Sequence, residues 1–316
     1  MSNQDTVSTT PLETSAPVGV RTESPSKSPS KSPSRSPPAQ NELVPADDFD
    51  HDSQGDADSS LGDDAESSTA SVSASILEYR RSQGRTYHSD KFTSNYFIPN
   101  DDQQLESMDL THHYLTLLLD NELFLAPVKT ESIQKQNHFD FIHLRYLFGA
   151  IKDWNALFKE AYRCCAPGGW VQSGEADVTF RSDDGTTELE PVFETYQKLF
   201  EDGGRILGNP FFVHDLQQKG FEEASFEDVK TVDYKFPIGG WPKDPKLAEI
   251  GRFVKLTLEN DLEGYTLMMW HDVVQWPKDE YQLFLMGLRR AICNPEVYSY
   301  MTVRYVYGRK GDPEQE

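Results

Sequence analysis

One stretch constrains the fold more than any other, and it runs from Phe139 to Val171 as FDFIHLRYLFGAIKDWNALFKEAYRCCAPGGWV. It begins with a short apolar run, Phe139 to Leu144, that has the length and composition of a buried strand. Apolar residues then recur at helical spacing from Trp154 to Tyr162. The Ala166-Pro167-Gly168-Gly169 segment stops this helix, because proline cannot continue it and glycine accepts a positive φ. With an extended run restarting at Trp170, the stretch predicts a strand–helix–strand unit of a parallel sheet.

The segments around this unit predict further helices and strands. Ahead of it, Ile76 to Arg81 and Asp101 to Leu119 have helical patterns, and the second places Leu105, Met108, Leu110, His112, Leu115 and Leu119 around an apolar face. After it we expect extended segments at Gln172 to Arg181, Phe226 to Phe236 and Tyr298 to Tyr307. Helices are expected at about 189–207, 211–219, 245–262, 264–275 and 278–293. The Gly203-to-Gly208 cluster follows a helical pattern and is interpreted as a helix end.

The first 75 residues have a different composition from the rest of the 316-residue chain. They contain no periodic apolar positions and are rich in Ser, Thr, Pro, Asp and Glu, so they cannot bury enough surface to offset chain entropy. Between Ser24 and Pro38 a serine-proline repeat recurs every four residues, which suits either a stiff spacer or a target of proline-directed kinases. We predict a disordered tail over 1–75 and one folded domain over 76–312.

Charge and cysteine content exclude several classes of protein. The net charge of −22 argues against general affinity for nucleic acid or anionic membrane, which need cationic surface. Ten of the acids lie between Asn41 and Ser68, where there is no Lys or Arg, so this segment is either a solvated tail or a docking segment for a basic protein partner. Three cysteines, no apolar leader and no apolar run of about eighteen residues predict a cytoplasmic or nuclear protein that is neither secreted nor membrane-spanning.

Several separate sequence blocks resemble one family. The FDFIHLR strand and the PGGW turn resemble the fourth and fifth strands of class I S-adenosylmethionine-dependent methyltransferases. The blocks YRRSQGRTYH at 79–88, LFLAP at 123–127 and FPIGGWPKD at 236–244 resemble the fungal LaeA-like members tied to secondary metabolism. The resemblance runs from about Tyr79 to Lys310. It implies an α/β, Rossmann-like sheet with a helical insertion, S-adenosylmethionine as the cofactor, and a small molecule or a protein as the methyl acceptor.

The chain departs from the family pattern ahead of Phe139. A class I methyltransferase presents its first three strands there, with a glycine-rich turn and an acid for the ribose hydroxyls. Here only the nine residues Lys129 to Asn137 separate Val128 from His138. Two strand–helix units and a third strand need about sixty residues. We therefore predict a truncated sheet, with the junction near 128–138, and a cofactor crevice that keeps one of its two walls.

Four residues are the candidates for cofactor contact. Leu144, Arg145 and Tyr146 follow the fourth strand, beside the place where the methyl group and the substrate lie in this architecture. Arg145 could face a carboxylate by bidentate pairing, or it could close the strand end through a local acid such as Asp153. The resemblance also places Tyr87 in the cap over the cofactor, while a tyrosine packed on the core is the alternative. No catalytic base is identified, and adjacent His112 and His113 point too far apart to hold a metal.

Two functions of different kinds follow. The first is an S-adenosylmethionine-dependent methyltransferase, with the first half of the sheet absent from this sequence because an exon was skipped either in gene prediction or in splicing. The second is a non-catalytic relative that acts as an interaction subunit. Its weakness is that the fourth strand, built for burial on both sides, becomes a sheet edge.

Overall fold

The computed structural model of the chain describes residues 43, 79–89, 96–128 and 139–312. Of the predicted tail, this includes only Leu43, whose side chain is buried. The serine-proline repeats, the acidic segment and the 129–138 junction lie outside the described residues, so the predictions made for them stay predictions.

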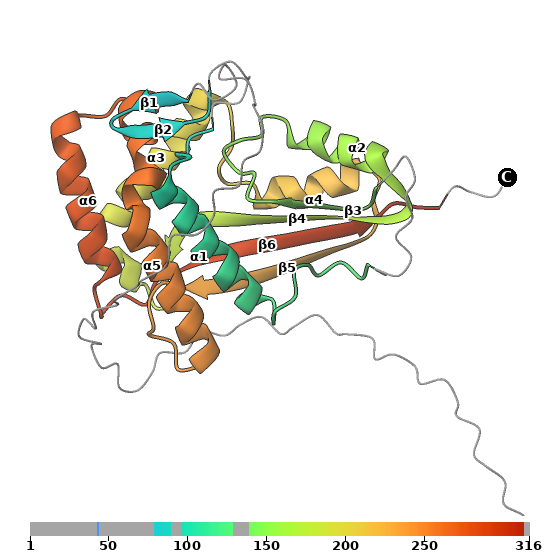
Figure 1. Ribbon diagram of the computed structural model, residues 1–316. Helices are drawn as coiled ribbons and strands as arrows, with labels where there is room; N and C mark the ends of the chain where they lie inside the picture. The colour runs from blue at the N-terminus through green and yellow to red at the C-terminus, as the bar shows by residue number, and fades with distance from the viewer. Residues whose placement is uncertain (1–42, 44–78, 90–95, 129–138, 313–316) are drawn as a thin grey trace, which may run out of the picture. The chain divides into compact units, whose positions relative to one another are not determined.

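A four-stranded sheet forms the centre of the fold (Figure 1). Its order is β3 (Phe139–Arg145), β4 (Cys165–Arg181), β6 (Tyr300–Arg309) and β5 (Glu227–Pro237). β3 and β4 are parallel, whereas β6 runs antiparallel to both of its neighbours. This confirms the predicted strand–helix–strand unit and the closing antiparallel pair. β3 and β5 are the two edge strands, and among the described residues no strand pairs with the free side of β3.

The connection between β3 and β4 forms for the reasons the sequence indicated. Helix α2 (Trp154–Cys164) is capped by Asp153, whose side chain accepts a 2.9 Å hydrogen bond from the Ala156 N–H. The helix ends at Cys164, and Gly168 then takes a φ of +74°. At Gly169 a Cβ would lie 2.9 Å from the Asp140 carbonyl oxygen, so the turn needs glycine at both positions.

Helices lie on both faces of the sheet (Figure 1). α2 and α4 (His214–Glu223) pack on each other and cover one face. α1 (Asp102–Leu118) and α5 (Pro245–Met268) pack together on the other side, near α3 (Val192–Leu207) and α6 (Lys278–Ile292). A 3-10 turn, Thr186–Leu189, precedes α3, and a π-helical segment, Met269–Val273, follows α5.

Side chains of β4 alternate between these two faces. The Ser173 hydroxyl accepts a 3.1 Å hydrogen bond from Gln217 of α4, so it lies on the α2–α4 side together with Glu175. Ala176 and Val178 face the opposite side, toward α1 and α5. The sheet therefore separates a closely packed layer from a layer that contains a cavity.

Three sequence predictions are wrong in part. Arg80 and Arg81 belong to β1 (Arg80–Ser82), not to a helix, and pair with β2 (Arg85–Tyr87). The turn between them, Gln83-Gly84, has positive φ at both residues (51° and 84°), which is the backbone of a tight hairpin. The described part of the predicted 76–81 helix is thus a strand.

The other two corrections concern α1 and α5. Leu105 and Met108 of α1 are half exposed (52% and 49%), while Gln104 and Ser107 are buried, because α5 packs on that polar face. The break predicted between the helices at 245–262 and 264–275 is confirmed, because α5 has non-helical backbone angles at Asp261 (φ −144°, ψ 51°). The second of these helices, however, ends at Met268 and is followed by the π-helical segment Met269–Val273. The remaining helices and strands, including the end of α3 at Gly208 with φ +71°, confirm the predictions within a few residues.

Candidate functional site

A cavity of about 190 Å³ lies between the sheet and helices α1, α3 and α5. Its sheet wall consists of Ala176 and Val178 of β4, Phe236 of β5 and Met301 of β6. Phe200 and further aromatic and aliphatic side chains close the opposite wall. The cavity is therefore mainly apolar, and its position at the carboxyl end of β3 is the one that α/β sheets use for ligands.

A small group of polar side chains interrupts the apolar wall: Gln104, Thr111, Tyr114, Tyr146 and Tyr265. The hydroxyls of Tyr114 and Tyr146 are 3.4 Å apart. Burial raises the pKa of both tyrosines, so their hydroxyls are protonated at neutral pH. Neither a carboxylate nor a histidine is among the described residues of the wall, so these polar side chains carry no charge. Arg145 is the one charged residue of the described wall.

Arg145 connects this cavity with a second pocket. The outer pocket has a volume of about 460 Å³ and is lined by His112, Leu123, His143, Leu144, Arg145 and Leu147. Arg145 Nη1 lies 3.2 Å from Nδ1 of His112. Among the described residues, Arg145 alone lines both spaces. The end of β3 thus contributes one side chain to a wall between two ligand-sized spaces.

The backbone just after β3 has an unusual conformation. Tyr146 takes a φ of +55°, which costs free energy for a residue with a bulky side chain. Its N–H donates a 3.0 Å hydrogen bond to the Gly174 carbonyl, which continues the β3–β4 pairing past Arg145. This conformation places the Tyr146 side chain in the cavity wall, where Leu147 and Phe148 follow it into the next turn.

Glu175 of β4 holds that turn in place. Its Oε2 accepts hydrogen bonds from the N–H groups of Leu147 (2.7 Å) and Phe148 (3.0 Å). Its Oε1 is buried and has no hydrogen-bond partner among the described residues. Burial raises the pKa of Glu175 to about 8, so the folded chain holds this carboxyl in its protonated form at neutral pH.

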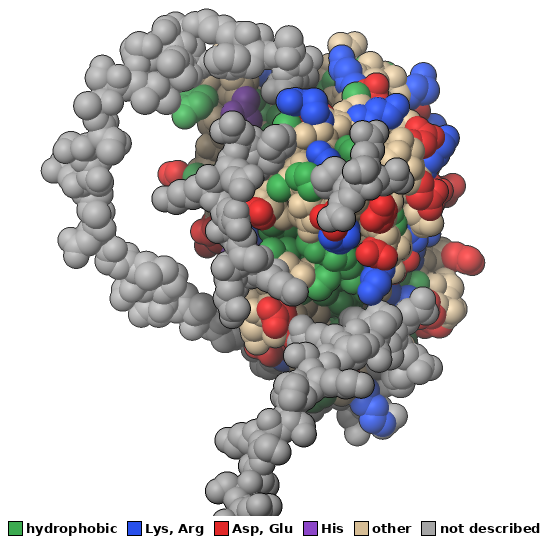
Figure 2. All heavy atoms as spheres, turned by 90° about the vertical axis from the view of Figure 1, so that its right-hand side faces the viewer, with side chains coloured by type: hydrophobic (Ala, Val, Ile, Leu, Met, Phe, Trp, Pro, Cys, Tyr) green, Lys and Arg blue, Asp and Glu red, His purple; other side chains and the backbone are tan. Residues whose placement is uncertain are grey.

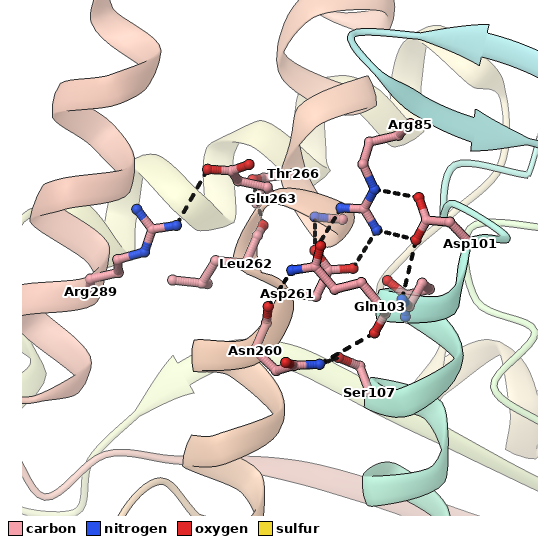
Figure 3. A network of polar contacts seen from close by, with 12 residues as sticks. Arg85, Asp101, Gln103, Ser107, Asn260, Asp261, Leu262, Glu263, Thr266 and Arg289 are labelled. Carbon is pink, nitrogen blue, oxygen red and sulfur yellow. Dashed lines mark hydrogen bonds and ion pairs between the residues drawn. The ribbon is translucent and has the colours of Figure 1, made fainter. Parts of the chain in front are cut away.

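A buried ionic network fixes the helices that enclose the cavity (Figure 3). Arg85 of β2 donates to both carboxylate oxygens of Asp261, each at 2.7 Å, and also to Asp101. Asp101 is the N-cap of α1, and Asp261 lies at the kink of α5, where it also accepts a 2.8 Å bond from the Gly264 N–H. These bonds, first to Asp261 and then to Asp101, raise the pKa of Arg85. One guanidinium therefore ties the hairpin, α1 and α5 together.

The structure brings three of the four predicted site residues together. Leu144 and Arg145 line the outer pocket, and Arg145 and Tyr146 line the cavity. Tyr87 lies apart from them in β2 and is not part of either wall. It is fully buried under Arg80, whose guanidinium carbon is 5.3 Å from the ring centre, and its buried hydroxyl has no hydrogen-bond partner in the described part of the chain.

Sequence reasoning missed Gln104 and Glu175. Gln104 stands three residues after Asp101, the spacing of a capping box, which indicates a helix start and not a cavity wall. Its backbone N–H does bond to the Asp101 side chain, at 3.3 Å. Glu175 lies inside a predicted strand, between Gly174 and Ala176 and two residues before Asp177, so no local pattern distinguishes it. Its hydrogen-bond partners, Leu147 and Phe148, follow β3 and not β4, so the sequence around Glu175 does not reveal them.

The described residues form neither a metal site nor a membrane-spanning helix. No group of three or more His, Cys, Asp or Glu side chains is placed to hold a metal ion there. In the same part of the chain, every helix is too short or too polar to cross a lipid bilayer. Seen from the end of the sheet at which β3 begins, basic and acidic side chains are interspersed around hydrophobic ones, so that face is not uniformly negative (Figure 2).

Comparison with known proteins gives a family match and several relatives. Residues 79–230 match the family of methyltransferase domains. Methyltransferase pytC of Aspergillus terreus is 24% identical, over 78% of this chain and 93% of its own length. Secondary metabolism regulator LAE1 of Cochliobolus heterostrophus is 26% identical, over 57% of this chain and 59% of its own.

A solved structure also matches, over part of its length. It is Haemonchus contortus phosphoethanolamine N-methyltransferase 2 in complex with S-adenosyl-L-methionine. The identity is 16% and the TM-score is 0.30, over 56% of this chain and 34% of that one. This chain therefore spans about a third of the length of the solved protein.

Proposed function

Because the chain belongs to the LaeA-like class I S-adenosylmethionine-dependent methyltransferases linked to fungal secondary metabolism, we propose that its two spaces are the two substrate sites of methyl transfer. The outer pocket would hold the cofactor, and the cavity would hold the methyl acceptor. The observation that supports this assignment is Arg145, which lines both spaces at the end of β3. Methyl transfer needs donor and acceptor side by side, and a shared wall provides that.

The residues of the outer pocket fit one end of the cofactor. The Arg145 guanidinium is suited to the carboxylate of its amino-acid part, and Leu144 and Leu147 offer apolar surface. No acid that could take the ribose hydroxyls lines this pocket among the described residues. The pocket therefore supplies part of a cofactor site. When bound, S-adenosylmethionine supplies a methyl group on a positively charged sulfur.

The cavity residues would act by positioning. The hydroxyls of Tyr114 and Tyr146 stay protonated at neutral pH, because burial raises the pKa of both. They can orient a polar group of the acceptor by hydrogen bonds, but they are poor general bases. Aligning two reactants can lower a barrier by several kcal/mol without any proton transfer. The described wall is thus suited to an acceptor whose nucleophilic atom needs little deprotonation.

The alternative, a non-catalytic interaction subunit, draws support from the free edge of β3. The acidic segment would dock its basic protein partner in that case. Calorimetric titration of the full chain with S-adenosylmethionine separates the two functions. The methyltransferase assignment predicts saturable heat that Arg145→Met weakens about tenfold or more, because a charge-assisted pair is lost.

Arg163→Met is the matched control for that titration. Arg163 is an exposed arginine of α2 that pairs only with groups on its own helix and lines neither pocket. Its replacement should leave the heat unchanged. No heat with the original chain would refute cofactor binding, and an equal effect of both variants would refute the place given to Arg145.

A further inference from the structure

Gln104 is buried inside α1 without the hydrogen bonds that its amide needs. The residue is 1% exposed, and neither Oε1 nor Nε2 has a partner of normal geometry among the described residues. The Tyr265 hydroxyl is close enough for Gln104 to lower the pKa of that tyrosine, which burial raises overall, but the two groups do not form a well-directed bond. Buried polar groups left unpaired are rare in native proteins because they cost stability.

The surroundings hold this amide in place at the cavity wall. The backbone N–H of Gln104 donates a hydrogen bond to the Asp101 side chain. Arg85 donates to both Asp101 and Asp261, and so connects this end of α1 to α5. The amide lies over Gly264, where a Cβ would come within 2.6 Å of Oε1. Glycine thus leaves room for the amide at the kink of α5, so an unsatisfied donor and an unsatisfied acceptor stay beside the cavity.

A second buried glutamine shows that the fold can satisfy the amide donor of such a side chain. Gln217 of α4 is 0% exposed, on the opposite side of the sheet. Its Nε2 donates to the Ser173 hydroxyl at 3.1 Å and to the Arg304 carbonyl at 3.3 Å. Among the described residues, Gln217 has partners for its amide donor but none for Oε1, whereas Gln104 has a partner for neither atom. The difference indicates that a molecule in the cavity completes the bonds of Gln104.

The rest of the wall restricts what that molecule can be. Nine of its 20 lining residues are phenylalanine or tyrosine, from α1, α3, α5, β5, residues 96–97 and the turn after β3, and a volume of about 190 Å³ admits one small, flat group. No described carboxylate faces the cavity, so a cation would lack a partner, and the tyrosine hydroxyls are protonated. The one charged side chain of the described wall, Arg145, is the group assigned above to the carboxylate of the cofactor. A ligand without net charge, carrying a donor and an acceptor side by side, matches both the walls and Gln104.

From these contacts we propose that the cavity binds an uncharged, largely aromatic small molecule with an amide or lactam group, and that Gln104 pairs with this group. The proposal rests on the assignment of the cavity as the acceptor site and names the class of acceptor. Gln104 would then be the residue that selects the acceptor. The aromatic rings would provide most of the affinity. The hydrogen bonds between the ligand's amide and Gln104 would set the orientation of the ligand.

A pair of small probes tests the proposal on the full chain without cofactor. Carbostyril, a bicyclic aromatic lactam, carries the donor and the acceptor, while naphthalene has nearly the same shape and carries neither. Ligand-observed NMR should show carbostyril bound about tenfold more tightly than naphthalene. Gln104→Met should remove that preference. Gln103→Met, on the exposed face of the same helix, should keep it.

Thermal unfolding gives a second readout that does not depend on the choice of probe. Gln104→Met should leave the melting temperature unchanged or raise it, because no protein bond is lost, whereas Gln217→Met should lower it. Equal affinities for the two probes, an unchanged preference in Gln104→Met, or equal destabilisation by both methionine variants would each overturn the proposal. These experiments contain no cofactor, so they test only the class of ligand that the cavity binds. The titration of Arg145→Met with S-adenosylmethionine tests the cofactor site independently of them.

Discussion

The protonated carboxyl of Glu175 makes the stability of the fold depend on pH in a direction that can be worked out. Its pKa is raised from an ordinary 4.5 to about 8 in the folded chain, because the side chain is fully buried. Between these two values the unfolded chain has released the proton and the folded chain retains it. The folded state therefore binds more protons, and stability falls as pH rises through this window.

The size of the effect follows from the width of the window. Each pH unit inside it costs about 1.4 kcal/mol of unfolding free energy. Between about pH 5.5 and about pH 7.5 this one group should remove roughly 2 to 3 kcal/mol. Glu175→Gln has an amide oxygen that can accept the same two bonds from Leu147 and Phe148 but has no proton to lose. The variant should therefore become more stable relative to the original chain as pH rises.

Urea unfolding of both proteins at three pH values across that range measures the difference. The control is Glu222→Gln, which changes an exposed carboxyl on α4 and should leave the pH profile as it is. If the curves of Glu175→Gln and the original chain run parallel with pH, Glu175 is ionised in the folded chain and the argument fails. If the variant instead loses several kcal/mol at every pH, the carboxylate itself is needed to hold the turn after β3.

Two further substitutions test how the fold is held together. Arg85→Met should cost about 3 to 5 kcal/mol, because it leaves two acids unpaired in a partly buried site, and adding Asp261→Asn should restore part of that loss in urea unfolding. No recovery in the double variant would argue against the shared network. Gly149 and Gly208 both take a φ of +71°, but a Cβ at Gly149 would lie 2.4 Å from a ring carbon of Phe211, whereas nothing lies within 4 Å at Gly208. Gly149→Ala should therefore lower the unfolding free energy by about 1 to 3 kcal/mol more than Gly208→Ala, and equal losses would show that Phe211 can move aside.

Local sequence patterns were sufficient for the unit from β3 to β4 and for the order of the later strands. The apolar run, the helical spacing and the proline–glycine stop are short-range signals, and each has a direct backbone cause. The same holds for the end of α3, where Gly208 adopts the left-handed conformation that only glycine adopts freely.

The errors arose where distant segments decide the local structure. Residues 80–82 form a strand because 85–87 pair with them across a two-residue turn. α1 buries Gln104 and Ser107 because α5, about 150 residues later, presents Asn260 and Gly264 to them. Periodicity within one helix contains none of this information.

The sequence predicted some residues of the candidate site but not how they are arranged in space. Leu144, Arg145 and Tyr146 follow a recognisable strand, so their place at its carboxyl end could be expected. That Arg145 stands between two pockets depends on α1 and the 123–127 segment, which the sequence pattern does not locate. Tyr87 was placed by resemblance alone, and it packs under Arg80 outside both walls.

Hydrogen–deuterium exchange of the full chain, with and without S-adenosylmethionine, tests most directly whether the end of β3 is the cofactor site. Binding there should slow exchange in the peptide that covers Leu144 to Phe148 and in the part of α1 around His112. α2 and α4, on the other face of the sheet, should be unaffected. Binding detected by heat without any slowing at Leu144 to Phe148 would contradict the account, as would slowing confined to other parts of the chain.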